Sequence, residues 1–196
     1  LAGQHDEKVS EGDRTAVGSW VSYGLGSQNQ KLTEYVVMGH SIGGCCGGEF
    51  AHGASYLGPN HAGVKLSTDP RNPLPFVTPF GQGVTAQEQK AELDLIGQLN
   101  RAVGVEYPED PQLRARIRSY ELAAGMQTAV PEIMDFETET EATQQLYGLD
   151  QEHSREFGTQ CLAARRLVEK GVRFVQLYHG AGGAGKWDAH NEIKKR

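Results

Sequence analysis

The sequence predicts an α/β protein, because it contains two strand-like runs and a helix that leads directly into the second of them. Tyr35 to Met38 is a short apolar run bounded by Gly39, which is typical of a buried strand. Val172 to Tyr178 is a stronger run of the same kind, and it follows an amphipathic segment that Gly171 ends. A helix joined to a strand by one or two residues forms the second half of a crossover between parallel strands.

Regular elements are sparse in the first half of the chain. Residues 1–14 form a polar lead-in, and Thr15 to Tyr23 is expected to form a short helix closed by Gly24. The strand at residues 35–38 is followed by a long proline-rich loop that extends to about residue 79. Within that loop, residues 63–66 and 74–78 are expected to form short edge strands.

The second half is dominated by helices with recognisable ends. Thr85 and Glu88 form a capping box that opens a helix running to Gly104. Asp110-Pro111 opens the next helix, since proline is tolerated at the first helical position, and Pro131 is expected to end it.

Two shorter signals complete the helical half. A second capping box, Thr138 to Glu141, opens a short helix that Gly148 stops. The last helix is expected to begin at Ser154, and helical spacing predicts a buried face made of Phe157, Cys161, Ala164 and Val168.

Composition limits the classes of function. The chain has 196 residues, 38% of them hydrophobic, which is enough for one domain with a core. The net charge is -6, and no basic run exceeds Lys194-Lys195-Arg196, so nucleic acid is excluded as a partner. Nothing approaches the roughly 20 consecutive apolar residues of a transmembrane helix.

Both ends of the sequence suggest an internal piece of a longer protein. The first residue is Leu1, residues 1–14 contain neither an apolar signal core nor a twin-arginine pair, and a polar run, residues 191–196, ends the sequence directly after a suggestive motif. We therefore interpret residues 1–196 as a single partial domain that lacks N-terminal and C-terminal parts, and we expect the piece alone to be inactive. Any targeting signal lies outside it.

A candidate metal site follows the 172–178 strand. After His179 and a glycine-rich loop come Asp188 and His190, which share one face of an extended segment because they are two residues apart. Ligands of open α/β sheets bind outside the carboxyl ends of strands, and a carboxylate with an imidazole suits a divalent metal. The alternative is a solvated surface pair.

Two other constellations compete with this site. Gly39-His40-Ser41-Ile42-Gly43 matches the nucleophile elbow of serine hydrolases, although the glycine-rich residues behind it favour a turn over the helix that an elbow requires. Cys45 and Cys46 lie near several histidines, but adjacent cysteines cannot easily bind one ion. The role of the two cysteines is left open. For Ser41, two alternatives remain: the nucleophile of a serine esterase, or part of a plain glycine turn.

A series of motifs follows one another along the chain: Gly18–Gln30, Tyr120–Ala123, Met126–Pro131, Leu146–Gly148, Cys161–Tyr178 and Trp187–His190. Their sequences and order resemble those of a bacterial family known as DUF1501, over about residues 14–193.

That family is similar to the alkaline-phosphatase and sulfatase superfamily. The resemblance implies an α/β sandwich, export to the periplasm or beyond, and a divalent metal such as zinc, calcium or magnesium. It also implies hydrolysis of small-molecule or glycan sulfate or phosphate esters, with Asp188 and His190 as metal ligands. The nucleophile is not assigned, because the sulfatase pattern Cys-x-Pro-Ser-Arg does not occur. A non-catalytic sulfatase-like binding protein is the remaining alternative.

Overall fold

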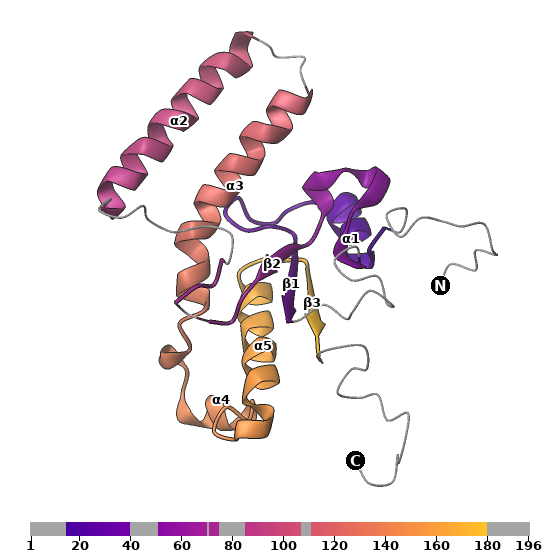
Figure 1. Cartoon of the computed structure of the whole chain (residues 1–196), viewed down its shortest axis with the longest axis vertical. Helices are drawn as coiled ribbons and strands as arrows, with labels where there is room; N and C mark the ends of the chain where they lie inside the picture. Colours follow the sequence, from indigo (N-terminus) through magenta and orange to yellow (C-terminus); the bar gives the residue numbers. More distant parts are fainter. Residues whose placement is uncertain (1–14, 40–50, 70, 75–84, 107–110, 180–196) are drawn as a thin grey trace, which may run out of the picture.

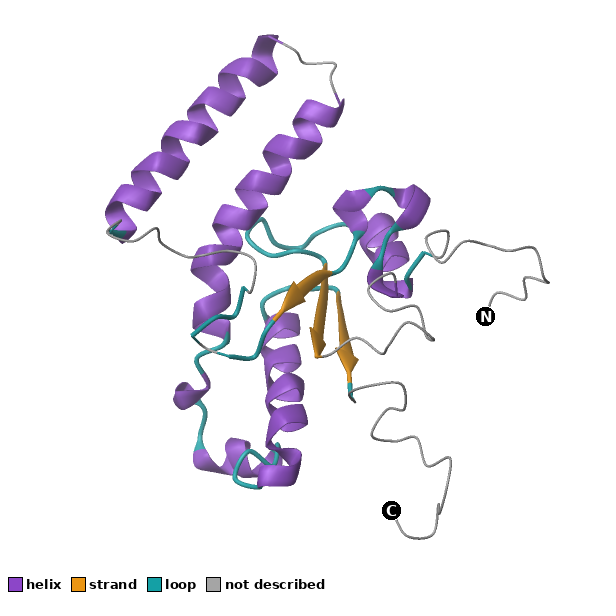
Figure 2. Ribbon diagram, in the orientation of Figure 1, coloured by secondary structure: helices purple, strands orange, loops and turns teal. Residues whose placement is uncertain are grey.

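A small parallel sheet lies at the centre of the computed structural model, which describes residues 15–39, 51–69, 71–74, 85–106 and 111–179. The strands are β1 (Tyr35–Gly39), β2 (Val64–Leu66) and β3 (Phe174–Tyr178), in the order β2-β1-β3. Both pairings are parallel, with Val36 opposite Val64 and Val175. The mixed α/β class predicted from the sequence is confirmed, and helices lie on both sides of the sheet (Figures 1 and 2).

The central strand separates two apolar layers, because its side chains alternate between the faces of the sheet. Val36 and Met38 belong to a core shared with α3 (Pro111–Ile133) and α5 (Glu152–Glu169). Tyr35 and Val37 lie on the other face, which α1 (Val17–Leu25) approaches. All four side chains are at most 1% exposed, so β1 is buried on both faces, as a central parallel strand should be.

The helix α1 approaches the sheet closely through a glycine. A Cβ atom at Gly18 would lie 2.5 Å from the Tyr35 ring. Two neighbouring serines bind the rest of the protein, since Ser19 donates to the carbonyl of Gly53 and Ser22 is paired with His61. These bonds connect α1 to the segment that precedes the short 3-10 turn Ser55–Leu57 and to the turn Pro59–His61.

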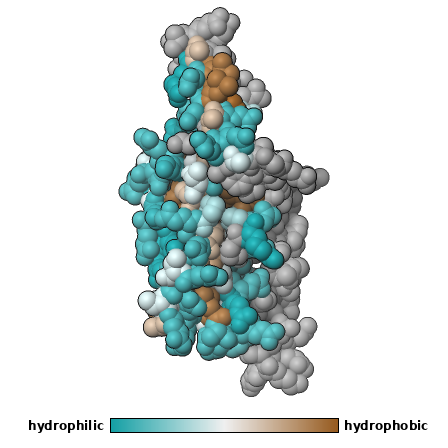
Figure 3. Space-filling model, turned by 90° about the vertical axis from the view of Figure 1, so that its left-hand side faces the viewer, coloured by the Kyte–Doolittle hydropathy of each residue, from teal (hydrophilic) through white to brown (hydrophobic). Residues whose placement is uncertain are grey.

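A helical hairpin of α2 (Ala86–Glu106) and α3 projects from the sheet (Figure 1). The capping box at its start is confirmed: the Thr85 amide donates to Glu88 Oε2 at 2.8 Å and the Glu88 amide to Thr85 Oγ1 at 3.2 Å. The apolar stripe of α2 remains exposed, with Leu95 at 55% and Leu99 at 58%. Figure 3 shows apolar side chains on this part of a largely hydrophilic face.

Several element boundaries differ from the sequence predictions. The helix α2 continues past Gly104 to Glu106, and α3 continues past Pro131 to Ile133. A proline near a helix end removes an amide hydrogen bond, but Val130 and Ile133 are anchored in the core at 0% and 1% exposure, which favours continuation. Of the edge strands expected, residues 64–66 form β2, whereas residues 75–78 lie outside the described residues.

The final two helices also start elsewhere than expected. The cap of α4 (Glu141–Leu146) is Thr140, whose hydroxyl accepts from the Thr143 amide at 3.2 Å. The helix α5 begins at Glu152, and Gly171 leaves it with a φ of 96° as expected. The predicted buried face of α5 was wrong: Val168 is 55% exposed, and the buried residues are Gly158, Gln160, Leu162, Ala163 and Leu167.

Candidate functional site at the carboxyl edge of the sheet

The carboxyl ends of the three strands lie at one edge of the sheet, because all strands are parallel. Gly39 is the last residue of β1 and is paired with Tyr178, the last residue of β3. The segments that contain Ser41, Cys45 and Cys46, and those that contain Asp188 and His190, follow these two strand ends in the sequence. All five residues lie outside the described part of the chain, so their arrangement stays a prediction.

A side chain at the last residue of β1 would collide with the backbone of β3. Gly39 has a φ of 91°, and a Cβ atom there would lie 2.2 Å from the carbonyl oxygen of Tyr178. Only glycine tolerates this combination of a positive φ and a close neighbour. The sequence identified Gly39 as the end of a strand, but it gave no sign of this close approach.

Gln160 of α5 contributes a polar atom to the same place. Its side chain is 5% exposed, and its Oε1 has no hydrogen-bond partner among the described residues. This oxygen lies 3.1 Å from the position that a Cβ would take at Gly39. A buried acceptor without a donor is rare and costly in folded proteins, so Gln160 Oε1 is a candidate for ligand contact.

A hydrogen-bonded chain lies on the other face of the sheet. Tyr35 donates its hydroxyl to Gln176 Oε1, and Gln176 Nε2 donates to the Tyr178 hydroxyl oxygen at 2.6 Å. Burial, with a smaller contribution from neighbouring Tyr178, raises the pKa of Tyr35, and burial also raises the pKa of Tyr178. Both phenols therefore stay neutral at physiological pH, and they fix the end of β3 without adding charge.

Two further side chains near this edge have limited chemical scope. His179 directly follows β3, and its ring centroid is 4.2 Å from that of Phe157. Cys161, next to Gln160 in sequence, is a free thiol whose pKa is raised by burial. A thiol with a raised pKa is a weak nucleophile, so Cys161 is better explained by packing than by catalysis.

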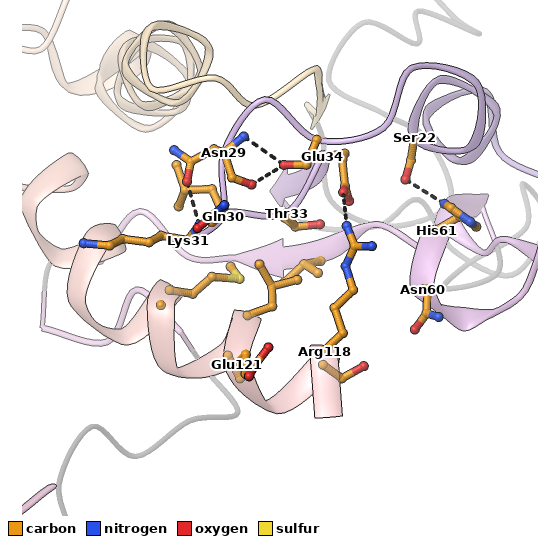
Figure 4. Close-up of a pocket in the computed structure, with 18 of the residues that line it drawn as sticks. Ser22, Asn29, Gln30, Lys31, Thr33, Glu34, Asn60, His61, Arg118 and Glu121 are labelled. Carbon is orange, nitrogen blue, oxygen red and sulfur yellow. Dashed lines mark hydrogen bonds and ion pairs between the residues drawn. The ribbon is translucent and has the colours of Figure 1, made fainter. Parts of the chain in front are cut away.

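A groove lies at the opposite, amino edge of the sheet (Figure 4). It has a volume of about 1390 Å³ and is bordered by the loop that enters β1, by α3 and by the turn at Pro59–His61. Arg118 of α3 reaches across it to Glu34, with 3.6 Å between Nη2 and Oε1. The Arg118 side chain is 74% exposed, so this ion pair contributes little to stability.

Ser22 and His61, which both border this groove, form a serine–histidine contact. Ser22 Oγ and His61 Nδ1 are 2.9 Å apart and point toward each other. Ser22 is 2% exposed and lies within α1, so a substrate carbonyl has no access to its hydroxyl. We interpret the pair as a structural link between α1 and the Pro59–His61 turn.

Within the described residues, no cluster of three or more histidine, cysteine, aspartate or glutamate side chains is arranged to hold a metal. In the same part of the chain, no helix combines the length and apolar character that crossing a bilayer requires.

The sequence reasoning missed Gln160 for an identifiable reason. Gln160, Ala163 and Leu167 follow helical spacing and are all buried, but the predicted face of α5 was rotated away from them. Had the sequence analysis chosen that stripe, it would have predicted a polar residue on a buried face of α5, which is a signal for function.

Comparison with known proteins identifies one relationship. A family model described as "Protein of unknown function (DUF1501)" matches residues 2–196. No curated protein and no solved structure matches the chain.

Proposed function

The chain belongs to the DUF1501 family, and we propose that it is part of an exported, metal-dependent hydrolase of sulfate or phosphate esters. One observation carries the proposal. The strands β1 and β3 are parallel and paired at Gly39 and Tyr178, so the segments that follow them start from neighbouring points. Ligand sites of open α/β sheets lie outside this edge. The choice of reaction rests on the likeness of the family to sulfatases and alkaline phosphatases.

A divalent cation fits the polar groups described at the edge. Gln160 Oε1 and the carbonyl oxygen of Tyr178 both approach Gly39, and both are neutral hydrogen-bond acceptors. Acceptor oxygens alone would repel the anionic sulfate or phosphate group, so binding such an ester here requires a cation. Asp188 and His190 would hold that cation, since a carboxylate and an imidazole are ordinary ligands of zinc and the carboxylate also suits calcium or magnesium.

The residues of the chain have separate tasks in this proposal. When bound, the cation supplies Lewis-acid polarisation of the ester oxygen. Gly39 lets the Tyr178 carbonyl and the Gln160 side chain come close to the end of β1, because it has no side chain there. Tyr35 and Gln176 hold the Tyr178 ring in place, and the buried core beneath β1 keeps the edge rigid.

Metal content tests this proposal directly. In the full-length protein we expect the double variant Asp188→Ala, His190→Ala to lose most of its bound metal, measured by elemental analysis after dialysis. Asp150→Ala, His153→Ala is a matched control, because it removes the same residue types from exposed positions at the start of α5. Activity toward 4-nitrophenyl sulfate and 4-nitrophenyl phosphate should fall in parallel. Equal metal content in both double variants would refute the assignment.

A further inference from the structure

A row of exposed aromatic rings leads into the groove at the amino edge of the sheet. Trp20 and Tyr23 of α1 and Tyr56 of the neighbouring turn are between 47% and 72% exposed. The Trp20 ring meets Tyr23 and Tyr56 edge to face, with centroids 6.2 Å and 5.8 Å apart. Tyr23 meets His61 in the same way at 5.4 Å, and these two residues border the groove. Exposed apolar groups that gather like this mark a binding surface, and here that surface continues into the groove.

The groove also presents polar side chains that are available to a ligand. Gln30, Asn60 and Glu121 are exposed at its border (Figure 4), and no hydrogen bond or ion pair joins their side chains to other described residues. Amides donate and accept hydrogen bonds, whereas a carboxylate only accepts them. A ligand with hydroxyl groups satisfies all three, because a hydroxyl both donates and accepts.

The charges around the groove balance. Lys31 and Arg118 border it with two positive charges, and Glu34 and Glu121 border it with two negative charges. A ligand with a strong net charge would therefore meet repulsion as well as attraction. This balance favours an occupant that is polar but uncharged.

The size and lining of the groove indicate an extended occupant. The volume of about 1390 Å³ exceeds the roughly 300–1,000 Å³ of a cleft that holds one drug-sized molecule. Leu32, Leu74 and Met126 also border the groove and are buried, so part of its lining is apolar. The occupant needs apolar faces for this lining and polar edges for the side chains at the border.

We propose that the groove and the aromatic row bind an uncharged oligosaccharide. Sugar rings have C–H faces that pack against the negative faces of aromatic rings, and their hydroxyl groups bond to amides and carboxylates. The aromatic rings meet edge to face, at interplanar angles of 71° to 90°, so they suit successive units of a bent chain. This site lies at the opposite edge of the sheet from the proposed hydrolytic site, and binding here requires neither a metal nor an ester.

Binding of neutral hexasaccharides to the full-length protein tests the proposal. The probes are maltohexaose, cellohexaose, xylohexaose, mannohexaose and N-acetylchitohexaose, each titrated by calorimetry in the presence of EDTA. At least one should bind, and its affinity should stay the same from about 0.05 to 0.5 M sodium chloride, because screening acts only on charged partners. Failure of all these probes to bind, or binding that salt abolishes, would overturn the proposal.

Two variants identify the surface that binds. Tyr23→Ala should weaken the affinity about two- to tenfold, the value of one aromatic contact. The matched control is Tyr120→Ala, because Tyr120 is 58% exposed against 59% for Tyr23 but does not border the groove; its affinity should match the wild type. Asn60→Ala should weaken binding by a similar factor, the effect of one hydrogen bond, without changing the melting temperature. Wild-type affinity in both Tyr23→Ala and Asn60→Ala would overturn the proposal.

The outcome is independent of the proposed hydrolase. The probes carry no sulfate or phosphate ester, so their binding reports on the groove alone. The double variant Asp188→Ala, His190→Ala should bind the same hexasaccharide as tightly as the wild type, whether or not it loses metal. A loss of hexasaccharide binding in that variant would place the sugar at the other edge of the sheet and overturn the assignment to the groove.

Discussion

Replacing Gly158 of α5 with alanine should destabilise the protein, although alanine is the better helix former. Intrinsic propensity favours alanine over glycine by about 1 kcal/mol in a helix interior. At Gly158, however, a Cβ would lie 1.9 Å from the carbonyl oxygen of Tyr147, whereas ordinary C···O contacts are about 3.3–3.6 Å. The backbone of residue 147 must therefore move by more than an ångström.

The expected magnitude follows from these two opposing effects. Overpacking of this kind costs up to about 3 kcal/mol, and subtracting the propensity gain of about 1 kcal/mol leaves a net destabilisation of roughly 2 kcal/mol. For a domain of this size, a change of 1 kcal/mol moves the melting temperature by about 2–4 °C. We expect Gly158→Ala to melt about 4–8 °C below the wild type in a calorimetric scan, with a matching loss in urea denaturation.

Gly97 of α2 provides the matched control. A Cβ there meets only the far end of the Arg101 side chain, at 3.6 Å, so Gly97→Ala should show the propensity gain alone and stabilise the protein by up to about 1 kcal/mol. If both variants were stabilised equally, the close packing of α5 against Tyr147 would be refuted.

The remaining predictions concern the core, an ion pair and two phenols. Leu167→Ala should cost about 2–5 kcal/mol in urea denaturation, because Leu167 is 0% exposed, and the neighbouring control Val168→Ala should cost far less at 55% exposure; similar costs would mean that the face of α5 is misassigned. Glu139→Gln should cost about 1–2 kcal/mol, since its carboxylate lies 2.6 Å from Arg165 and is 14% exposed, whereas Asp69→Asn, which breaks the exposed pair with Arg71, should leave urea stability unchanged. The pKa of Tyr35 is raised in the folded protein, by burial and then by Tyr178, so its contribution to stability is complete below the ordinary tyrosine pKa of about 10 and is lost as pH rises beyond it. Tyr35→Phe should therefore reduce the fall in stability between neutral and strongly alkaline pH, and an unchanged pH profile would contradict the burial of that hydroxyl.

Features of the fold that depend on local chemistry could be predicted from the sequence. The capping box at Thr85 and the exit through Gly171 depend on residues only a few positions apart, and both are present. The strands around Val36 and Val175 were found because buried parallel strands require continuous apolar runs. Features set by distant partners were missed, as in the continuation of α3 through Pro131, where core contacts outweigh the missing amide.

The same division applies to the candidate site. Sequence reasoning reached the carboxyl edge of β3, because the rule for ligand sites in α/β sheets needs only the strand and its direction. It missed Gln160, because the predicted buried face of α5 was rotated away from that residue. It could not find the close approach at Gly39, because that depends on how β3 lies against β1. Asp188 and His190 lie outside the described residues, so their role as metal ligands stays a prediction.

The order β2-β1-β3 has a consequence for how the protein is made. The central strand pairs with a strand that the ribosome delivers much later, since the Tyr35 to Gln176 contact joins residues 141 positions apart. Until β3 emerges, one edge of β1 has no partner, and contacts of such long range slow folding. The nascent chain therefore exposes an apolar strand edge until residues 174–178 have emerged, and an edge of this kind is prone to pairing with other chains at that stage.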